Sequence, residues 1–294
     1  MLFFKKKLTT TAQVFSLVLA STAASYSYAE TTPVAATTPQ LSVQLWSVKD
    51  AMQADFEGTL TKLAAMGFDG VEFAGFFGKY ANDAAGLKAF LTTLGLKASG
   101  AHVPFDKFSP ENFDATVAFY KAMDCHYLII PMDQRAFTVE GAKAVAADLA
   151  AVQEKLTPFG MQVGYHNHKP EMLGEMGKTP WDVIGKNTNS KVILQQDVGW
   201  TEVAGKDPVD FVKAYPGRTI TTHYKASAPE PGNTEDPILG KDTTDWKALI
   251  TANKTIGGTQ WLVVEQESYP AGMTPMQSVE ASLKGLQAII ADMK

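Results

Sequence analysis

The sequence predicts a single (β/α)8 TIM barrel, and three observations support this. Short runs rich in β-branched and other apolar residues alternate with amphipathic helical segments about eight times. The alternation extends over about 250 residues, the usual size of such a barrel. No glycine-rich phosphate fingerprint follows the first strand, where the chain reads Trp46-Ser47-Val48-Lys49-Asp50. An open doubly wound sheet is therefore disfavoured.

Each predicted helix shows apolar residues at helical spacing, as in Phe56, Leu60 and Leu63 before the helix-ending Gly67. The predicted strands are residues 41–46, 70–73, 97–103, 127–130, 162–166, 192–197, 219–224 and 261–265. The predicted helices that follow them are residues 56–66, 84–94, 110–123, 138–156, 181–185, 208–214, 245–253 and 276–293. Segment 226–244 is too long for a routine connection and predicts a functional loop over the active face.

The first residues differ in character from the rest. Lys5-Lys6-Lys7 precedes an interrupted apolar run at 12–24 and small residues before Ala29, which predicts a signal peptide cleaved after Ala29. We therefore expect a periplasmic or secreted protein, with a flexible lead-in at 30–40 and one domain at 41–294. The run is shorter than the about 20 residues that span a bilayer, so no membrane association is expected after cleavage.

Charge and cysteine content exclude several classes of protein. The net charge is −5, the pI is near 5.6, and lysines and arginines are scattered beyond the N-terminus. Nucleic acid is therefore not an expected partner. The single cysteine, Cys125, allows no intramolecular disulfide, so stability must come from the core.

Candidate functional groups gather at the predicted carboxyl ends of the strands, where barrels of this type hold their active sites. They are Glu72, His102, His166, Asp197, His223 and Glu265, with His168 and Glu171 just beyond the fifth strand. Asp197, His223, Glu265 and one group from the fifth strand mix carboxylate and imidazole ligands. Such a set suits Mn²⁺, Mg²⁺, Co²⁺ or Zn²⁺.

Each of these residues also has an ordinary structural interpretation. A carboxylate at a strand end is commonly a helix cap or ion-pair partner, and a lone histidine is commonly a hydrogen-bonded structural residue. Trp46 and Trp200 are either core aromatics or platforms for sugar rings. Lys225 points the same way as His223 and either binds a substrate oxygen or pairs with Asp197 or Glu265.

Six segments carry a resemblance to a known family. They are Gln44-Leu45-Trp46-Ser47-Val48, Gly70-Val71-Glu72-Phe73, Tyr165-His166-Asn167-His168, Asp197-Val198-Gly199-Trp200, His223-Tyr224-Lys225 and Val264-Glu265-Gln266-Glu267. In this order they resemble the strand motifs of the sugar phosphate isomerase/epimerase family, the xylose isomerase-like TIM barrels. The resemblance implies a divalent metal held by Glu, Asp, His and Glu and a small sugar as substrate.

Three of the four ligand positions are occupied by Asp197, His223 and Glu265. In the resemblance the usual fifth-strand Glu aligns best with His166, which implies that His166 is the fourth ligand, that His168 or Glu171 reaches in from the loop, or that the metal is weakly held. Trp200 stands where many epimerases have a second histidine. Gln44, Trp46, Glu171 and Trp200 are the expected substrate-binding residues.

The resemblance implies that the metal polarises a carbonyl while a base removes the neighbouring proton. His102, His168 and Glu72 are candidates for this proton transfer, with Lys225 steadying the oxyanion. Reprotonation gives an isomerase or epimerase, and loss of a β-substituent gives a lyase or dehydratase. Export and the absence of an arginine cluster favour a non-phosphorylated sugar or keto-sugar. A non-catalytic carbohydrate-binding barrel stays an alternative, whereas an abasic-site endonuclease is disfavoured by acidity and export.

Overall fold

The computed structural model describes residues 2, 39–226 and 236–294. The predicted signal peptide and nearly all of the predicted lead-in lie outside these residues, as does most of the first half of the 226–244 segment. The first strand begins at Gln40, one residue earlier than expected.

The described residues contain eight parallel strands that form a nearly closed barrel, which confirms the predicted (β/α)8 fold. The strands are β1 (Gln40–Gln44), β2 (Gly70–Phe73), β3 (Lys97–His102), β4 (Tyr127–Ile130), β5 (Gln162–His166), β6 (Ile193–Gln195), β7 (Thr221–Tyr224) and β8 (Trp261–Val264). They pair in the order β6-β5-β4-β3-β2-β1-β8-β7. Between β6 and β7 the contact is a short bridge, in which the His223 backbone N–H donates to the Gln196 carbonyl over 2.8 Å. This bridge brings Asp197 beside His223.

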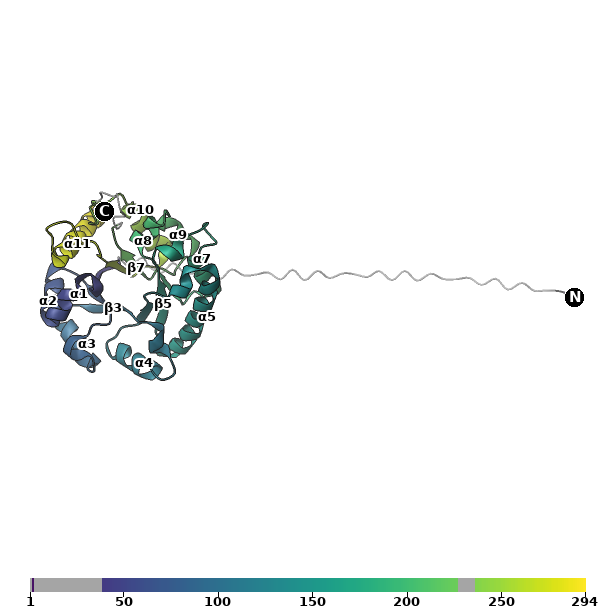
Figure 1. Ribbon diagram of the computed structural model, residues 1–294, viewed down its shortest axis with the longest axis horizontal. Helices are drawn as coiled ribbons and strands as arrows, with labels where there is room; N and C mark the ends of the chain where they lie inside the picture. Colours follow the sequence, from purple (N-terminus) through teal and green to yellow (C-terminus); the bar gives the residue numbers. More distant parts are fainter. Residues whose placement is uncertain (1, 3–38, 227–235) are drawn as a thin grey trace. The chain divides into compact units, whose positions relative to one another are not determined.

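Helices surround the ring of strands (Figure 1). They are α1 (Lys49–Ala54), α2 (Phe56–Met66), α3 (Ala84–Thr93), α4 (Phe113–Ala122), α5 (Val139–Leu156), α6 (Lys169–Met172), α7 (Pro180–Asn187), α8 (Val198–Val203), α9 (Pro208–Ala214), α10 (Trp246–Ala252) and α11 (Pro275–Ala291). Within the described ranges, no helix has the length and apolar character needed to cross a membrane.

Most element boundaries differ from the sequence-based expectation by one to three residues, and two of these differences have a clear cause. Helix α4 begins at Phe113 and not at 110, because the backbone N–H groups of Asn112 and Phe113 both bond to the Ser109 carbonyl in a preceding turn. The predicted strand 192–197 ends at Gln195, because Asp197 caps the short helix α8 with its side chain. Helices α1, α6 and α8 are too short for sequence periodicity to reveal them.

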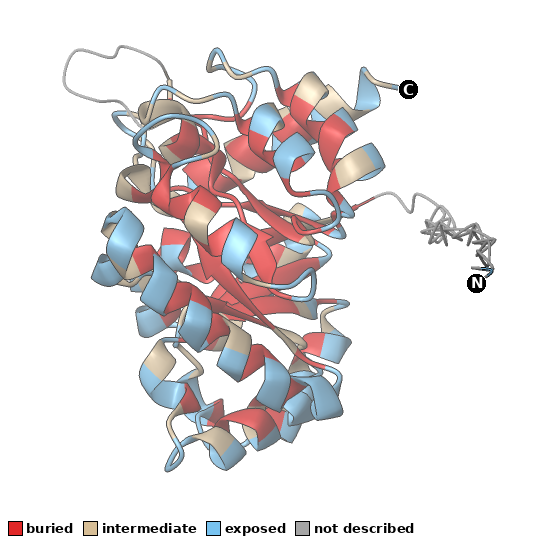
Figure 2. Ribbon diagram, turned by 90° about the vertical axis from the view of Figure 1, so that its right-hand side faces the viewer, coloured by how far each residue is buried: buried red, intermediate tan, exposed pale blue. Residues whose placement is uncertain are grey.

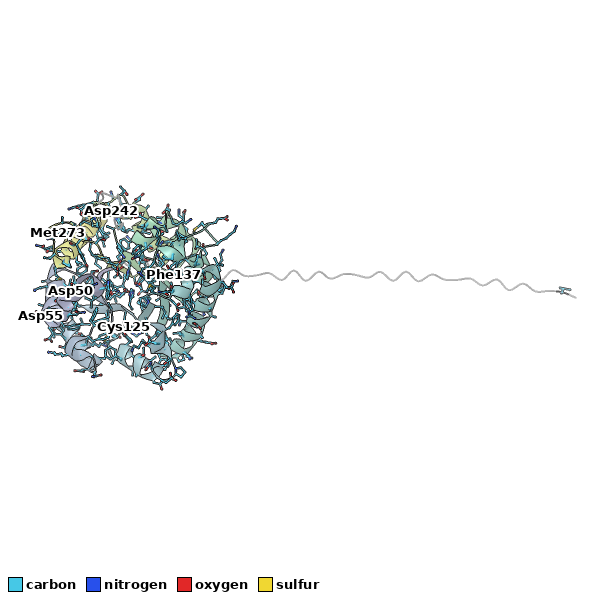
Figure 3. All side chains as sticks on the ribbon, viewed as in Figure 1. Asp50, Asp55, Cys125, Phe137, Asp242 and Met273 are labelled. Atoms are coloured by element: carbon cyan, nitrogen blue, oxygen red, sulfur yellow. The ribbon has the colours of Figure 1, made fainter. Side chains whose placement is uncertain are left out.

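The strands are buried while the outer faces of the helices are exposed (Figure 2), as expected for a parallel sheet covered by helices. The lone cysteine, Cys125, is buried and free (Figure 3). Polar side chains fill the barrel interior toward the carboxyl ends of the strands, and Glu72 is fully buried there. Gly100 makes room for it, since a Cβ at Gly100 would lie 3.1 Å from Glu72 Oε2.

Candidate metal centre

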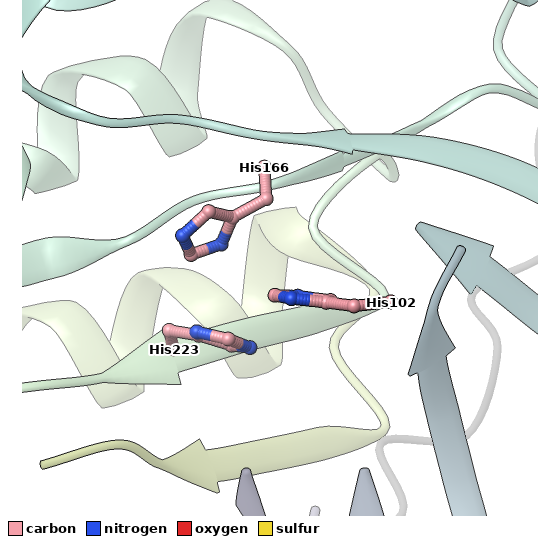
Figure 4. A group of neighbouring side chains, drawn as sticks. All are labelled: His102, His166 and His223. Atoms are coloured by element: carbon pink, nitrogen blue, oxygen red, sulfur yellow. The ribbon is translucent and has the colours of Figure 1, made fainter. Parts of the chain in front are cut away.

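Four side chains with metal-ligating atoms meet at the carboxyl end of the barrel. His166 is the last residue of β5, Asp197 follows β6, His223 lies in β7, and Glu265 follows β8. One ligand atom from each lies within 4.8 Å of the others, and all four residues are buried. Figure 4 shows the His166 ring tilted above the nearly parallel rings of His102 and His223. The ring centroids of His166 and His223 are 4.5 Å apart.

The geometry of these atoms fits a cation. Nδ1 of His223 lies 3.0 Å from Glu265 Oε2 and 4.0 Å from Asp197 Oδ2, and Nε2 of His166 lies 3.9 Å from the same Asp197 oxygen. Ligands about 2.0–2.2 Å from a shared metal are separated by distances of this order. Asp197 Oδ2 is buried and accepts no hydrogen bond from any described residue, while Oδ1 accepts from the Trp200 backbone N–H. A buried carboxylate oxygen in this position requires a positive partner.

The local charge also favours a cation. Asp197, Glu265 and Glu267 lie around Lys225, whose Nζ is 3.4 Å from both Asp197 Oδ2 and Glu265 Oε2 and also pairs with Glu267. One ammonium therefore balances only part of the carboxylate charge. Without a metal, burial raises the pKa of Asp197 to about 7 although Lys225 opposes this shift. The residues present thus fit a divalent cation, which would hold Asp197 ionised.

The structure also selects among the candidate fifth-strand ligands. His166 lies in the cluster, whereas His168 and Glu171 do not belong to it. Glu171 is buried in loop contacts, accepting hydrogen bonds from the Tyr165 hydroxyl at 2.9 Å and from the His168 backbone N–H at 3.1 Å. Its expected substrate contact is therefore corrected to a structural role at the start of α6.

Glu72, expected as a proton-transfer group, has another role. Oε1 lies 2.6 Å from His223 Nε2 and accepts from Gln44 Nε2 at 2.6 Å, and Oε2 accepts from Gln195 Nε2 at 2.6 Å. Burial raises the pKa of Glu72, but His223 and His102 outweigh it and hold this pKa well below its usual value. A fully buried, hydrogen-bonded carboxylate of this kind is a poor proton acceptor. Glu72 instead orients His223, as a carboxylate behind a metal-ligating histidine does.

Gln44, expected to contact substrate, is also corrected. Its side chain is fully buried. Nε2 donates to Glu72 and Oε1 accepts from the Trp46 backbone N–H, so both polar atoms are already bonded within the protein. It therefore supports Glu72 from below the site.

A cavity of about 530 Å³ opens beside the cluster. His102, His166, His168 and Glu265 contribute polar groups to its lining, and Trp46, Pro104, Pro131 and Met132 contribute apolar surface. Its volume is in the range of small-molecule sites. Trp46 is 40% exposed and belongs to the lining of this cavity, and its contact with substrate stays a prediction.

His168 is the group best placed for proton transfer in this cavity. Its Nδ1 has no hydrogen-bond partner among the described residues. Burial, and next Lys225, lower the pKa of His168 to about 4, so its ring is neutral at pH 7. His102, the second histidine of the lining, is held by Gln195, with His102 Nε2 2.9 Å from Gln195 Oε1.

Trp200 and Lys225 lie together behind the cluster. Nζ of Lys225 is 4.8 Å from the centroid of the Trp200 ring and also pairs with Glu267. Trp200 does not line the 530 Å³ cavity, but its buried Nε1 has no hydrogen-bond acceptor in the described ranges. A polar substrate group reaching past Lys225 would satisfy it.

Sequence reasoning missed two residues of this site, Gln195 and Glu267. Gln195 lies two residues before Asp197, and Glu267 two residues after Glu265, so strand alternation places each on the same side as a predicted ligand. This two-residue alternation along the strands was the sequence signal that could have identified both residues. Glu267 belongs to one of the resembling motifs and Gln195 to a predicted strand, but neither was predicted as a site residue.

Comparison with known proteins gives relatives at low identity. No family model matches the chain. An inosose dehydratase of Lacticaseibacillus casei is 23% identical over 277 residues, covering 80% of this chain and 90% of the relative. A sugar phosphate isomerase/epimerase structure from Parabacteroides distasonis has a TM-score of 0.72 at 22% identity, covering 86% of this chain and 96% of that chain.

A structure of L-ribulose 3-epimerase has a TM-score of 0.63 at 16% identity, covering 86% of this chain and 96% of that one. These likenesses show the fold, which is that of the xylose isomerase-like TIM barrels, as the sequence motifs indicated.

Proposed function

We propose that this protein is a divalent-metal-dependent isomerase or epimerase that moves a proton next to the carbonyl of a non-phosphorylated sugar or keto-sugar. The observation that carries the proposal is the convergence of His166, Asp197, His223 and Glu265 at the edge of a 530 Å³ cavity. Among the described residues, Asp197 Oδ2 has an ion pair with Lys225 but no hydrogen-bond donor. A divalent cation bound there supplies Lewis-acid polarisation of a substrate carbonyl and its neighbouring hydroxyl.

The chain's own residues supply the proton transfer. His168 lines the cavity and its ring is neutral at pH 7, so it is the residue that accepts the proton α to the carbonyl. Lys225 lies behind the cluster, where Glu267 and two cluster carboxylates hold it, and its positive charge favours negative charge that develops on a substrate oxygen next to the cluster. Return of the proton to the other face of the enediolate, or to the neighbouring carbon, completes the reaction.

The cavity supports the substrate class. Lys107 is the one cationic residue in its described lining, and arginine is absent from that lining, so a phosphate would lack the usual bidentate partner. The apolar side of Trp46 and Met132 suits the non-polar face of a sugar ring. Export, predicted from the N-terminal segment, also supports a substrate without phosphate.

A lyase acting on a keto-sugar or keto-glycoside is the second candidate. The lyase and the isomerase share the removal of the proton next to the carbonyl. In the lyase the enediolate then expels a substituent from the β-carbon and is not reprotonated. The observation that favours the lyase is the likeness to an inosose dehydratase.

Solvent-deuterium exchange tests the proposal. Protein loaded with Mn²⁺ in D₂O is incubated with D-fructose, L-ribulose and a 3-keto-glucoside, and the C–H positions next to the carbonyl are followed by NMR. We expect deuterium in at least one of these sugars. Asp197→Ala and His168→Gln should abolish the exchange, whereas His126→Gln, at an exposed histidine, should leave it intact. Exchange that survives Asp197→Ala, or that is absent from all three sugars, would contradict the proposal and favour a carbohydrate-binding barrel.

A further inference from the structure

The side chain of Gln195 lies in the middle of the buried polar cluster, between the histidines and Glu72. Its Oε1 is 3.2 Å from His166 Nδ1 and 2.9 Å from His102 Nε2. Its Nε2 is 2.6 Å from Glu72 Oε2 and 2.6 Å from Thr221 Oγ1. Every polar atom of this amide therefore has a partner.

The orientation of the Gln195 amide follows from the chemistry of its neighbour. An ionised carboxylate only accepts hydrogen bonds, so the atom that Gln195 turns toward Glu72 must be its NH₂ group. The opposite orientation would set two acceptor oxygens 2.6 Å apart in a buried site. The amide oxygen is therefore turned toward the histidines.

An amide oxygen is likewise only an acceptor, so the histidine nitrogens that face it must carry hydrogen. Nδ1 of His166 donates to Gln195 Oε1, and a neutral imidazole has only one N–H. Nε2 of His166 then keeps its lone pair, on the side where Asp197 Oδ2 lies 3.9 Å away. That is the side of the candidate metal centre.

We propose that Gln195 is a positioning residue that fixes His166 in the Nδ1–H tautomer, so that Nε2 is presented as a metal ligand. The inference rests on the proposed function for its purpose, but its physical content concerns hydrogen positions in the metal-free protein. Glu72 is the common anchor, since it orients the Gln195 amide through Oε2 and the His223 ring through Oε1. One buried carboxylate thereby aims one nitrogen from each of two histidines at the same point.

Nitrogen NMR of protein labelled with ¹⁵N-histidine tests this directly. In metal-free wild type, the His166 signals, assigned by their loss in His166→Gln, should show the Nδ1–H tautomer. In Gln195→Met, which keeps the length of the side chain but removes the acceptor, His166 should shift toward the Nε2–H form. Mn²⁺ affinity measured by calorimetry should fall by about 10–100-fold, as is typical when a partner behind a ligating histidine is lost.

Thr221→Val is the matched control. It removes the second acceptor of the Gln195 NH₂ group and a long hydrogen bond of 3.5 Å to Glu72 Oε2, but it keeps the Gln195 amide oxygen, the Gln195–Glu72 bond and both histidines. The tautomer and the Mn²⁺ affinity should therefore both match wild type. An Nε2–H tautomer in wild-type protein would overturn the inference, even if Gln195→Met fails to fold. So would an unchanged tautomer in Gln195→Met. Failure of wild-type protein to bind Mn²⁺, with the Nδ1–H tautomer present, would instead count against the proposed function.

Discussion

Oε1 of Glu72 lies 2.6 Å from Nε2 of His223, on the edge of the ring opposite Nδ1, which faces Glu265. Since Nε2 donates to Glu72, a neutral His223 has its lone pair on Nδ1, pointing at carboxylates. Either a proton or a metal must then lie between Nδ1 and Glu265. Burial lowers the pKa of His223, but Glu72 and Glu265 outweigh burial and raise it to about 10 in the absence of metal.

Glu72→Gln tests whether the Glu72 carboxylate holds the His223 ring in place. The variant removes the charge that holds the His223 ring and leaves buried donors without their acceptor, so we expect about 3 kcal/mol lower stability and about 10–100-fold weaker Mn²⁺ binding. Chemical denaturation and titration calorimetry measure the two effects. Glu57→Gln is the control, because Glu57 also accepts from a side chain, the Tyr80 hydroxyl, but lies away from the cluster. Equal effects in the two variants would contradict the role given to Glu72.

His166→Glu tests the effect of the unusual fifth-strand residue on metal choice. Two imidazoles and two carboxylates favour Zn²⁺ or Co²⁺ over Mg²⁺, which prefers oxygen ligands. Replacing one imidazole by a carboxylate should therefore lower the ratio of Zn²⁺ to Mg²⁺ affinity by about tenfold or more. Competition titrations of wild type and variant measure this ratio. An unchanged ratio would show that His166 is not a ligand.

Lys225→Met should separate metal binding from chemistry. The ammonium lies 3.4 Å from the same two oxygens that face the metal position, so its removal should strengthen Mn²⁺ binding by about tenfold through loss of like-charge repulsion. The same variant should lose deuterium exchange into the keto-sugar, since the charge that stabilises the oxyanion is gone. Weaker Mn²⁺ binding together with intact deuterium exchange would contradict both the repulsion between Lys225 and the metal and the role of Lys225 in stabilising the oxyanion.

The pH dependence of the unfolding free energy should reveal the raised pKa of the Glu171 carboxyl. Burial raises the pKa of this carboxyl to about 7, against about 4.3 in the unfolded chain. Between these values the folded state holds a proton that the unfolded state has lost, so stability falls as pH rises through this window and is level above pH 7. Relative to Glu171→Gln, the wild type should lose on the order of 3 kcal/mol from pH 4.5 to pH 7.

Denaturant unfolding of both proteins across this pH range, with a chelator present, measures the difference. Other titrating groups, including Asp197, contribute equally to both proteins and cancel. Parallel pH profiles for wild type and Glu171→Gln would contradict the raised pKa.

The fold could be predicted from sequence because alternation of strands and helices is a repeated signal, and the metal cluster because parallel strands all end at the same edge of the barrel. Asp197, His223 and Glu265 needed only that rule to be placed together. The sequence favoured His166 by alignment but left His168 and Glu171 open, and the loop geometry, with Glu171 hydrogen-bonded to Tyr165, separates them.

The roles of Glu72 and Gln44 could not be predicted in the same way. Strand ends bring residues to one face, but the depth of each side chain in the barrel depends on the register between strands and on space such as that left by Gly100. The sequence therefore predicted that Glu72 lies at the site, but not that it is fully buried and hydrogen-bonded to His223. Sequence patterns likewise say nothing about which nitrogen of a histidine holds its hydrogen, which here depends on Gln195.

We propose that two imidazoles and two carboxylates bind one divalent ion in this barrel. X-ray absorption spectroscopy of the Co²⁺-loaded protein tests it most directly, because the outer-shell scattering of the imidazole ring counts histidine ligands. The structure predicts two imidazoles in wild type, one in His166→Ala, and two in His102→Ala, since His102 belongs to the cavity wall. One imidazole in wild type, or loss of one on replacing His102, would contradict the claim.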